Sequence, residues 1–216
     1  MNYIFGTVGD DWLEGTSSDD VIYGGEGTNR IIARGGDNQI YGGSAADWIR
    51  AGDGNDTIYA NEGENIIDAG GGDNLIYGGS AADWITTGSG DDTIYAGEGV
   101  NTINTGDGND IIYSGSGDDF INAGIGQNQI WLGGGQDTIG LEMWGFSEIN
   151  NFNPYQDQID LGLSDLRGVV LIGQGNNTLI GLAHRSIMAT LHNVDVQTVA
   201  AQSTDIFGAE LTVFSS

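Results

Sequence analysis

The 216-residue sequence contains no cysteine and no lysine, and its only proline is Pro154. Without cysteine the chain forms no disulfide and has no thiol chemistry. No segment approaches the roughly 20 apolar residues of a membrane-spanning helix. The start, MNYIFGTVGDD, lacks the basic and apolar regions of a Sec signal peptide. We therefore expect one continuous domain without disulfides and without a membrane span.

Positive charge is also scarce. Five arginines oppose 31 acidic residues, which gives a formal charge of −26, and 23 of the acids lie within residues 6–140. Repulsion at this density opposes a compact fold. One interpretation is a solvated acidic surface that aids solubility. The other is that hard cations neutralise the acids, because carboxylate and carbonyl oxygens crowded in loops suit calcium. Such a charge disfavours a nucleic-acid partner.

A nine-residue repeat dominates the sequence. Residues 6–140 divide into fifteen nonapeptides without insertion or deletion, from GTVGDDWLE to LGGGQDTIG. The eighth position is Leu13 once and isoleucine in every later repeat, and the sixth position is always Asp or Asn. A short fixed period of this kind is typical of solenoid proteins.

Each nonapeptide combines a polar turn with a short strand. Its first six residues are rich in Gly, Asp and Asn, which tolerate the conformations of tight turns. Two nonapeptides form one coil, and stacked coils give two parallel sheets with isoleucine facing isoleucine. The expected fold is all-β: a parallel β-roll, or two-sheet β-solenoid, with two nonapeptides per coil over residues 1–140. Residues 1–5 are expected to form a first strand at the open end.

Four repeats carry a resemblance to a known family: AGDGNDTIY (51–59), TGSGDDTIY (87–95), TGDGNDIIY (105–113) and SGSGDDFIN (114–122). They resemble the RTX repeat, GGxGxDxUx with U a large aliphatic residue. The resemblance covers residues 6–140 and implies a parallel β-roll that holds several Ca²⁺ ions between the turns of successive coils. In that family the ligands are sixth-position Asp carboxylates and carbonyls of the turn glycines.

The resemblance therefore implies a set of calcium ligands in this chain. They are sixth-position side chains and turn glycines: Asp11, Asp20, Asp47, Asp56, Asp83, Asp92, Asp110, Asp119, Asp137, Asn38, Asn74, Gly52, Gly54, Gly88, Gly90, Gly106, Gly108, Gly115 and Gly117. Successive turns on one edge of the roll are two nonapeptides apart. Asp92 with Asp110, and Asp119 with Asp137, are expected to form the tightest sites, because both neighbouring turns then carry a carboxylate.

The sixth position departs from the regular Asp of the family. Along each edge Asp mostly alternates with Asn, which occupies six repeats: Asn29, Asn38, Asn65, Asn74, Asn101 and Asn128. This leaves the number of occupied sites open, because calcium affinity depends on ligand charge. Acids at fifth positions could compensate: Asp37, Asp73, Asp91 and Asp118. Alternatively, stacked Asn side chains can form a hydrogen-bonded ladder without any ion.

Three turns lack glycine at the fourth position, where Ser18, Ala45 and Ala81 stand instead. A Cβ at positive φ costs on the order of 1 kcal/mol. One interpretation is that the two SAAD turns, which contain Ala45 and Ala81, adopt another shape and hold no metal; the other is that Asp47 and Asp83 of these turns remain calcium ligands.

The ninth positions of one sheet form an outward aromatic row: Tyr23, Tyr41, Tyr59, Tyr77, Tyr95, Tyr113 and Trp131. Cross-strand packing alone explains such a row. The alternative is a binding face for self-association, for glycans or for another surface, with Tyr41, Tyr59, Tyr77, Tyr95 and Tyr113 as its candidate residues. Ice binding is disfavoured, because no regular threonine row exists.

After Gly140 the period ends, and residues 141–216 are predicted to cap the last coil, which would otherwise expose isoleucine and open strand edges. The pattern predicts strands and a helix in the following order: a segment similar to RTX caps (145–166), two strands joined by GQGNN (167–182), a third strand (186–194), a short helix (194–202) and a final strand (210–214). RTX proteins usually leave the cell by type I secretion, and the tail 203–216 is similar to such secretion signals.

No catalytic motif is present. A Ser–His–Asp set could be assembled from Ser186, His192 and Asp195, but no GxSxG motif supports it, His184 has no matching nucleophile, and HExxH is absent. We therefore expect a non-catalytic calcium-binding β-roll, secreted or at the cell surface, that folds on meeting extracellular Ca²⁺. The alternative is a structural or adhesive surface protein that acts through its aromatic face.

Overall fold

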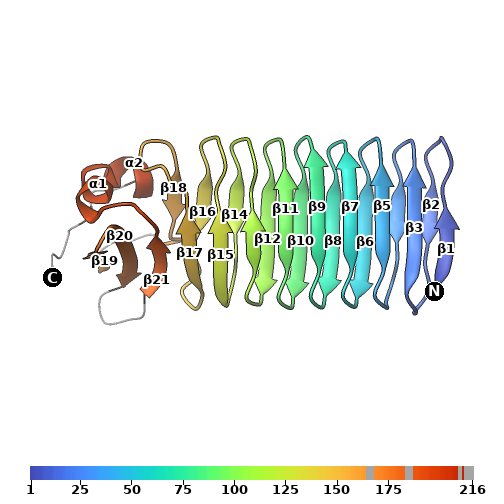
Figure 1. Cartoon of the computed structure of the whole chain (residues 1–216), viewed down its shortest axis with the longest axis horizontal. Helices are drawn as coiled ribbons and strands as arrows, with labels where there is room; N and C mark the ends of the chain where they lie inside the picture. Colours follow the sequence, from blue (N-terminus) through green and yellow to red (C-terminus); the bar gives the residue numbers. More distant parts are fainter. Residues whose placement is uncertain (164–167, 183–186, 209–210, 212–216) are drawn as a thin grey trace.

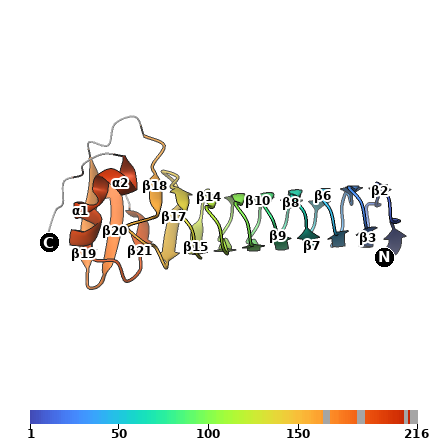
Figure 2. The same ribbon diagram turned by 90° about the horizontal axis from the view of Figure 1, so that it is seen from above.

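The computed structural model shows a long two-sheet solenoid with a small cap at its C-terminal end (Figures 1 and 2). It describes residues 1–163, 168–182, 187–208 and 211. The predicted all-β parallel β-roll is confirmed. Among the described residues, no helix is long and apolar enough to cross a lipid bilayer.

One sheet has twelve strands, and those of the roll pair in parallel. In spatial order they are β1 (Asn2–Phe5), β3 (Asp20–Gly25), β5 (Gln39–Gly43), β7 (Thr57–Glu62), β9 (Leu75–Ser80), β11 (Thr93–Gly97), β13 (Ile111–Tyr113), β15 (Gln127–Trp131), β17 (Phe146–Asn150), β21 (Ile187–Leu191), β20 (Asn177–Leu182) and β19 (Val169–Gln174). The expected first strand is therefore β1, which pairs with β3.

The other sheet has nine parallel strands. In spatial order they are β18 (Gln158–Asp160), β16 (Thr138–Gly140), β14 (Phe120–Asn122), β12 (Thr102–Asp107), β10 (Trp84–Ser89), β8 (Ile66–Gly71), β6 (Trp48–Asp53), β4 (Arg30–Ile32) and β2 (Trp12–Glu14). Odd and even strands alternate along the chain, so each coil contributes one strand to each sheet.

The core is a double column of isoleucine between the two sheets. Each eighth-position side chain pairs in register with its counterpart two repeats later, as Ile58 does with Ile76 and Ile76 with Ile94. The eighth-position isoleucines are at most 1% exposed, and Leu13 is 7% exposed. Strand side chains alternate between the two faces. The side chains at the sixth position, the eighth position and the first position of the following nonapeptide therefore all point inward. Burial of each isoleucine contributes about 1.5–3 kcal/mol.

Close stacking of the turns requires glycine. Gly72, at a fourth position, has a φ of 109°, and a Cβ there would lie 2.3 Å from the carbonyl oxygen of Gly54 in the preceding turn. The two SAAD turns differ from each other. Ala81 keeps a glycine-like φ of 90°, so that turn retains the shape despite the strain, whereas Ala45 lies outside the positive-φ region.

The coil continues past the end of the nonapeptide period. Ile149 of β17 pairs with Ile130, and Ile159 of β18 pairs with Ile139, so both keep the inward column. Residue 140 marks the end of the sequence period, and the roll itself extends to Asp160.

The cap continues the twelve-stranded sheet beyond β17, the last strand of the roll in that sheet. Strands β19 and β20 form a hairpin across Gly175 and Asn176, and β21 pairs in parallel with β17. Two short helices follow, α1 (Val196–Ala201) and α2 (Ser203–Phe207); α1 contacts the hairpin and α2 contacts β18. The predicted strand 210–214 falls largely outside the described residues.

Candidate functional site

The sixth-position side chains form one hydrogen-bonded ladder along each edge of the roll. From Asp11 to Asp119, the backbone N–H of each sixth residue donates to the Oδ1 of the sixth-position residue two repeats later. Asn38 donates to Asp56 at 2.7 Å, Asp56 to Asn74 at 3.0 Å and Asn74 to Asp92 at 2.8 Å. From Asp20 to Asp137 these residues are only 0–2% exposed. Asp and Asn are therefore equivalent in the Oδ1 half of the ladder.

The second side-chain atom separates the two residue types. In five of the six Asn turns, Nδ2 donates to the fourth-position glycine carbonyl of its own turn. The distance is 2.8 Å from Asn38 to Gly36 and 2.9 Å from Asn74 to Gly72. Asn128 donates instead to the Ala123 carbonyl at 2.8 Å. Every sixth-position Asn is thus satisfied within the protein.

Seven aspartates bury an oxygen that has no donor. Within the described part of the chain, no hydrogen bond reaches the buried Oδ2 of the donor-free aspartates: Asp47, Asp56, Asp83, Asp92, Asp110, Asp119 and Asp137. An unsatisfied buried group costs about 1–3 kcal/mol, and more when it is charged. These turns therefore lack a positive partner for a carboxylate.

The first two aspartates are different. Oδ2 of Asp11 accepts from the backbone N–H of Thr7 at 2.5 Å, and Oδ2 of Asp20 accepts from that of Thr16 at 2.6 Å. Both also accept from the hydroxyl of the same threonine at 3.0 Å. Burial acts to raise the pKa of Asp20, but the bonds from Thr16 and Asn2 outweigh it and hold that pKa below its ordinary value.

The pKa values of the donor-free aspartates move in the opposite direction. Burial raises the pKa to about 6 at Asp56, Asp83, Asp92, Asp119 and Asp137, and it raises the pKa of Asp47 and Asp110 as well. Desolvation disfavours the charged form, and the ladder bonds compensate only in part. These carboxyls therefore favour either a proton or a cation.

The turns offer the oxygen ligands that a hard cation needs. Second- and fourth-position carbonyls stack in columns: the Gly52 oxygen lies against Gly70, and the Gly54 oxygen against Gly72. The same stacking holds for the other glycines predicted as ligands. No three His, Cys, Asp or Glu side chains converge among the described residues. An ion would thus be held by one or two carboxylates and by backbone carbonyls, an all-oxygen set that fits Ca²⁺.

The two predicted Asp–Asp pairs are brought together as expected. The N–H of Asp92 donates to Asp110 at 2.9 Å, and that of Asp119 donates to Asp137 at 3.0 Å. Neither Oδ2 atom of either pair accepts a hydrogen bond, although the buried Ser114 hydroxyl lies beside Asp119. The hydroxyls of Thr87 and Thr105, beside Asp92 and Asp110, donate to backbone carbonyls instead.

Comparison with protein-family models identifies the repeat. The RTX calcium-binding nonapeptide repeat, a model of four copies, matches residues 5–40, 41–76, 69–103, 77–112 and 104–139. Together these matches cover 135 of the 216 residues. The chain belongs to the RTX family. Its repeats bind calcium ions, several to the repeat domain, as the resemblance implied.

Two further comparisons were made for this RTX chain. A search of curated proteins gave no match. Among solved structures, the chain is similar to the crystal structure of the extracellular lipase LipA from Serratia marcescens, with 15% sequence identity and a TM-score of 0.35. The match covers 94% of this chain and 40% of the lipase chain.

The fifth-position acids of the RTX turns form a second ladder that runs in the opposite direction. Here the N–H of the later turn donates to the earlier side chain: Asn55 to Asp37 at 2.7 Å, Asp91 to Asp73 at 2.8 Å and Gln136 to Asp118 at 2.8 Å. These bonds lie at exposed positions. The fifth-position carboxylates therefore line the outside of the turns, and the sixth-position side chains line the inside.

Asp157 extends the inner ladder and was missed by the sequence analysis. Its Oδ1 accepts from the N–H of Asp137 at 3.1 Å, and its Oδ2 accepts from Asn153 at 2.7 Å. The signal was the triplet Asp157–Gln158–Ile159, which keeps the Asp-x-Ile pattern of the repeats. Two inserted residues hide it, because they make the spacing from Asp137 longer than two nonapeptides.

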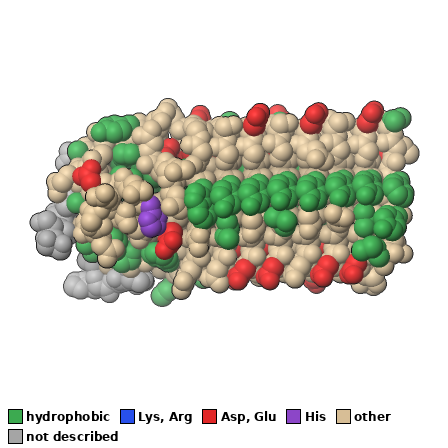
Figure 3. Space-filling view, viewed as in Figure 1, with side chains coloured by type: hydrophobic (Ala, Val, Ile, Leu, Met, Phe, Trp, Pro, Cys, Tyr) green, Lys and Arg blue, Asp and Glu red, His purple; other side chains and the backbone are tan. Residues whose placement is uncertain are grey.

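The aromatic row is a continuous stack of rings on the twelve-stranded sheet. From Phe5 through the six tyrosines to Trp131, neighbouring ring centroids lie 4.8–5.3 Å apart and the ring planes agree within 19°. Figure 3 shows this stack as an unbroken band along the roll, with acidic side chains along both edges. Tyr23 and Tyr95 are 37% and 38% exposed. The predicted aromatic face therefore exists, extended by Phe5.

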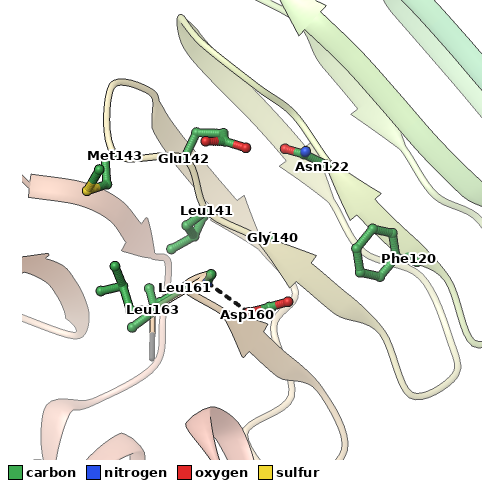
Figure 4. A pocket seen from close by; sticks show the side chains of 10 residues that line it. Phe120, Asn122, Gly140, Leu141, Glu142, Met143, Asp160, Leu161 and Leu163 are labelled. Atoms are coloured by element: carbon green, nitrogen blue, oxygen red, sulfur yellow. Dashed lines mark hydrogen bonds between the residues drawn. The ribbon is translucent and has the colours of Figure 1, made fainter. Parts of the chain in front are cut away.

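A hollow of about 290 Å³ lies where the roll meets the cap (Figure 4). It opens because Gly140, which pairs with Asn122 and Asp160, carries no side chain. Its rim includes Phe120 and Glu142. Asp160 accepts a hydrogen bond from the Gly162 N–H at 2.8 Å, and the described residues that line the hollow include no histidine, serine or cysteine.

The structure describes two members of the Ser–His–Asp set considered from the sequence, His192 and Asp195. Asp195 caps α1 by accepting from the N–H groups of Gln197 and Thr198. His192 lies 3.8 Å from Glu148. Ser186 and His184 are outside the described residues.

Proposed function

We propose that this RTX chain is a secreted, non-catalytic calcium-binding β-roll whose fold is stabilised by extracellular Ca²⁺. The observation that carries the proposal is the set of donor-free aspartates. Seven turns of one fold bury a carboxylate oxygen beside stacked carbonyls and supply no donor to it. A divalent cation would supply the positive charge that these oxygens lack in the protein alone.

Charge explains why calcium and folding would be coupled. The formal charge is −26, and folding packs 23 of the acids into the roll, most of them in the turns along its two edges. A ligand that binds only the folded state stabilises it by RT ln(1 + [L]/Kd), or about 2.7 kcal/mol at a hundredfold excess over Kd. Weak sites would leave the chain poorly folded where calcium is scarce and order it where calcium is millimolar.

Circular dichroism in calcium and in chelator tests this function. We expect strand signal and cooperative unfolding in calcium, with both weakened in chelator and restored when calcium is returned. Magnesium is the control ion, because it demands a tighter octahedral shell and gives up its water reluctantly. A chain equally folded and equally stable in chelator and in calcium would contradict the proposal.

Export by type I secretion is the cellular part of the proposal. Its support is the family and the similarity of residues 203–216 to uncleaved C-terminal signals. The test is expression of the full chain, and of a chain lacking residues 203–216, in bacteria with and without a type I exporter. We expect the full chain alone to reach the medium, and only with the exporter. Equal export of both chains would contradict this route.

A second candidate is a structural or adhesive role for the aromatic stack. The faces of each ring are covered by its neighbours, so the stack presents mainly ring edges and hydroxyls. That arrangement favours contact with another flat surface, such as a second copy, over stacking of sugar rings. The outward row of the other sheet is interrupted, since the Arg30 guanidinium lies between Trp12 and Trp48.

Analytical ultracentrifugation separates this candidate from the first. Replacement of Tyr59, Tyr77 and Tyr95 by serine should abolish any self-association, whereas Trp84→Ser on the opposite sheet should leave it intact. A monomer in all three proteins would count against self-association and leave the calcium function standing.

A further inference from the structure

We infer that internal N–H donors replace calcium at eight of the fifteen turns, so that only the donor-free aspartates take ions. The eight comprise the six Asn turns and the turns of Asp11 and Asp20. The inference rests on the proposed function, because it assumes that calcium binds at the turns. It assigns, turn by turn, which side chains need the ion.

Asp and Asn place their second atom at the same point of the turn. A Cβ added to Gly24 would lie 3.0 Å from Nδ2 of Asn29. A Cβ added to the equivalent glycines Gly42 and Gly78 would lie 2.6 Å and 2.7 Å from Oδ2 of Asp47 and Asp83. Since Oδ1 makes the same ladder bond in both residue types, exchange of Asp for Asn exchanges an oxygen for an N–H donor at one fixed place.

The amide donor removes the need for an ion. In the turn of Asn38, Nδ2 lies 2.8 Å from the Gly36 carbonyl, which leaves no space for an ion between them. The remaining oxygen, Oδ1, accepts the N–H of Asp20. Asn74 is held in the same way by Gly72 and Asp56. Both Asn residues therefore leave the set of calcium ligands that the resemblance implied.

The threonine donors act similarly at the start of the roll. Oδ2 of Asp11 and of Asp20 each accept two hydrogen bonds, one from a backbone N–H and one from a hydroxyl. A carboxylate so satisfied gains little from a cation. These two aspartates also leave the ligand set, whereas Asp47 and Asp83 of the SAAD turns stay in it, because their Oδ2 atoms are buried without a donor.

The arrangement spaces the ions along the roll. Asp47, Asp56 and Asp83 each lie between two Asn turns on their edge, so a neighbouring charged turn is two coils away, roughly 9.6 Å at the usual strand spacing. Donor-free aspartates occupy neighbouring turns only in the two Asp–Asp pairs near the C-terminal end, and the second pair is followed on the ladder by Asp157. We therefore expect the ions to concentrate toward the cap and the first coils to need none.

Three single substitutions in the full chain test the inference. Asp56→Asn supplies a donor at a donor-free turn, and Asp20→Asn is its matched control on the same edge. Asn65→Asp performs the reverse change between Asp47 and Asp83. Bound calcium is counted by equilibrium dialysis with atomic absorption, and stability is measured by urea unfolding in chelator.

We expect Asp56→Asn to lose one bound ion per chain and to unfold at higher urea in chelator. Asp20→Asn should keep the wild-type ion count. Asn65→Asp should gain one ion and unfold at lower urea in chelator. Loss of an ion in Asp20→Asn, or an unchanged count in Asp56→Asn, would overturn the inference while leaving calcium binding itself intact. A wild-type chain that binds no calcium would instead overturn the proposed function, and this inference with it.

Discussion

Two features require glycine in these turns: a positive φ and the close approach of a backbone carbonyl from the neighbouring turn. Gly71 and Gly72 are consecutive, but only Gly72 has positive φ and would press a Cβ to 2.3 Å from a backbone oxygen. A Cβ on Gly71 meets nothing closer than 3.4 Å. The requirement for glycine therefore holds at the fourth position of this turn, and at the second position, where Gly70 also has positive φ, but not at the third.

We predict that Gly72→Ala destabilises the protein by about 1–3 kcal/mol, since it combines backbone strain with a carbonyl overlap. Gly71→Ala, the matched control, should shift stability by less than about 0.5 kcal/mol. Thermal unfolding in calcium measures both. Because the turn of Gly72 carries Asn74, the effect should persist in chelator; equal stability of the two variants would contradict this reading of the stacked turns.

The raised carboxyl pKa values predict an unusual pH dependence without calcium. At Asp56 the folded-state pKa is about 6, above the ordinary 3.8 that applies on unfolding. The folded state therefore binds the proton more tightly, and the stability from protonation is complete below about pH 4 and lost as pH rises through about 6. Chelated protein should unfold at higher urea at about pH 4.5 than at about pH 7.5.

Calcium should reverse that order. Protons and cations compete for the same oxygens, so calcium affinity should fall as pH drops below about 6. Urea unfolding with saturating calcium should thus show its gain over chelator mainly at neutral pH. If the chelated protein were less stable at about pH 4.5 than at about pH 7.5, the raised pKa values of the buried aspartates would be contradicted.

The eighth-position isoleucine is the largest buried side chain in most strands of the roll. Ile66 and Ile67 are adjacent in β8, yet Ile66 is 51% exposed and Ile67 is 1% exposed. Ile67→Ala should cost about 2–5 kcal/mol through lost burial and the cavity left behind. Ile66→Ala should change stability little, although it makes the same substitution one residue earlier. Urea unfolding in calcium compares the two, and similar losses would contradict the inward column.

The sequence predicts these strands well because the period leaves a single register. The isoleucine that recurs once in every nine residues determines which face of the strand is buried. The Asp or Asn two residues before it determines where the turn ends. The period could not predict the last coil, where spacings slightly longer than two nonapeptides carry Ile149 and Ile159 into the column. The strands of the last coil still pair when the turn between them is longer, but a search for a strict nine-residue period misses them.

The candidate site was predictable only in part. Spacing alone brings Asp92 beside Asp110 and Asp119 beside Asp137. It cannot tell that Asp20 is satisfied by Thr16 while Asp56 has no donor, because both occupy sixth positions on the same edge. That difference depends on which backbone N–H groups remain free near each carboxylate, and only three-dimensional geometry decides it. Spacing alone likewise cannot predict that Ala81 adopts a glycine-like positive φ.

The roll carries exposed and buried negative charges, and the two differ in how strongly dissolved salt screens them. The fifth-position acids are exposed, so mobile ions screen their repulsion within a Debye length of about 10 Å at 0.1 M salt. The donor-free oxygens are buried, and bulk salt does not reach them. Screening should therefore relieve one kind of charge and leave the other uncompensated.

We predict that sodium chloride raised to about 0.5 M increases the stability of the chelated protein only modestly, because it screens surface repulsion alone. Millimolar calcium at the same ionic strength should add a further and larger increase, since it reaches the buried oxygens. Urea unfolding midpoints under the three conditions provide the measurement, with magnesium as the matched divalent ion. If sodium chloride alone reproduced the calcium midpoint, surface repulsion would suffice to explain the instability, and the buried carboxylates would need no cation.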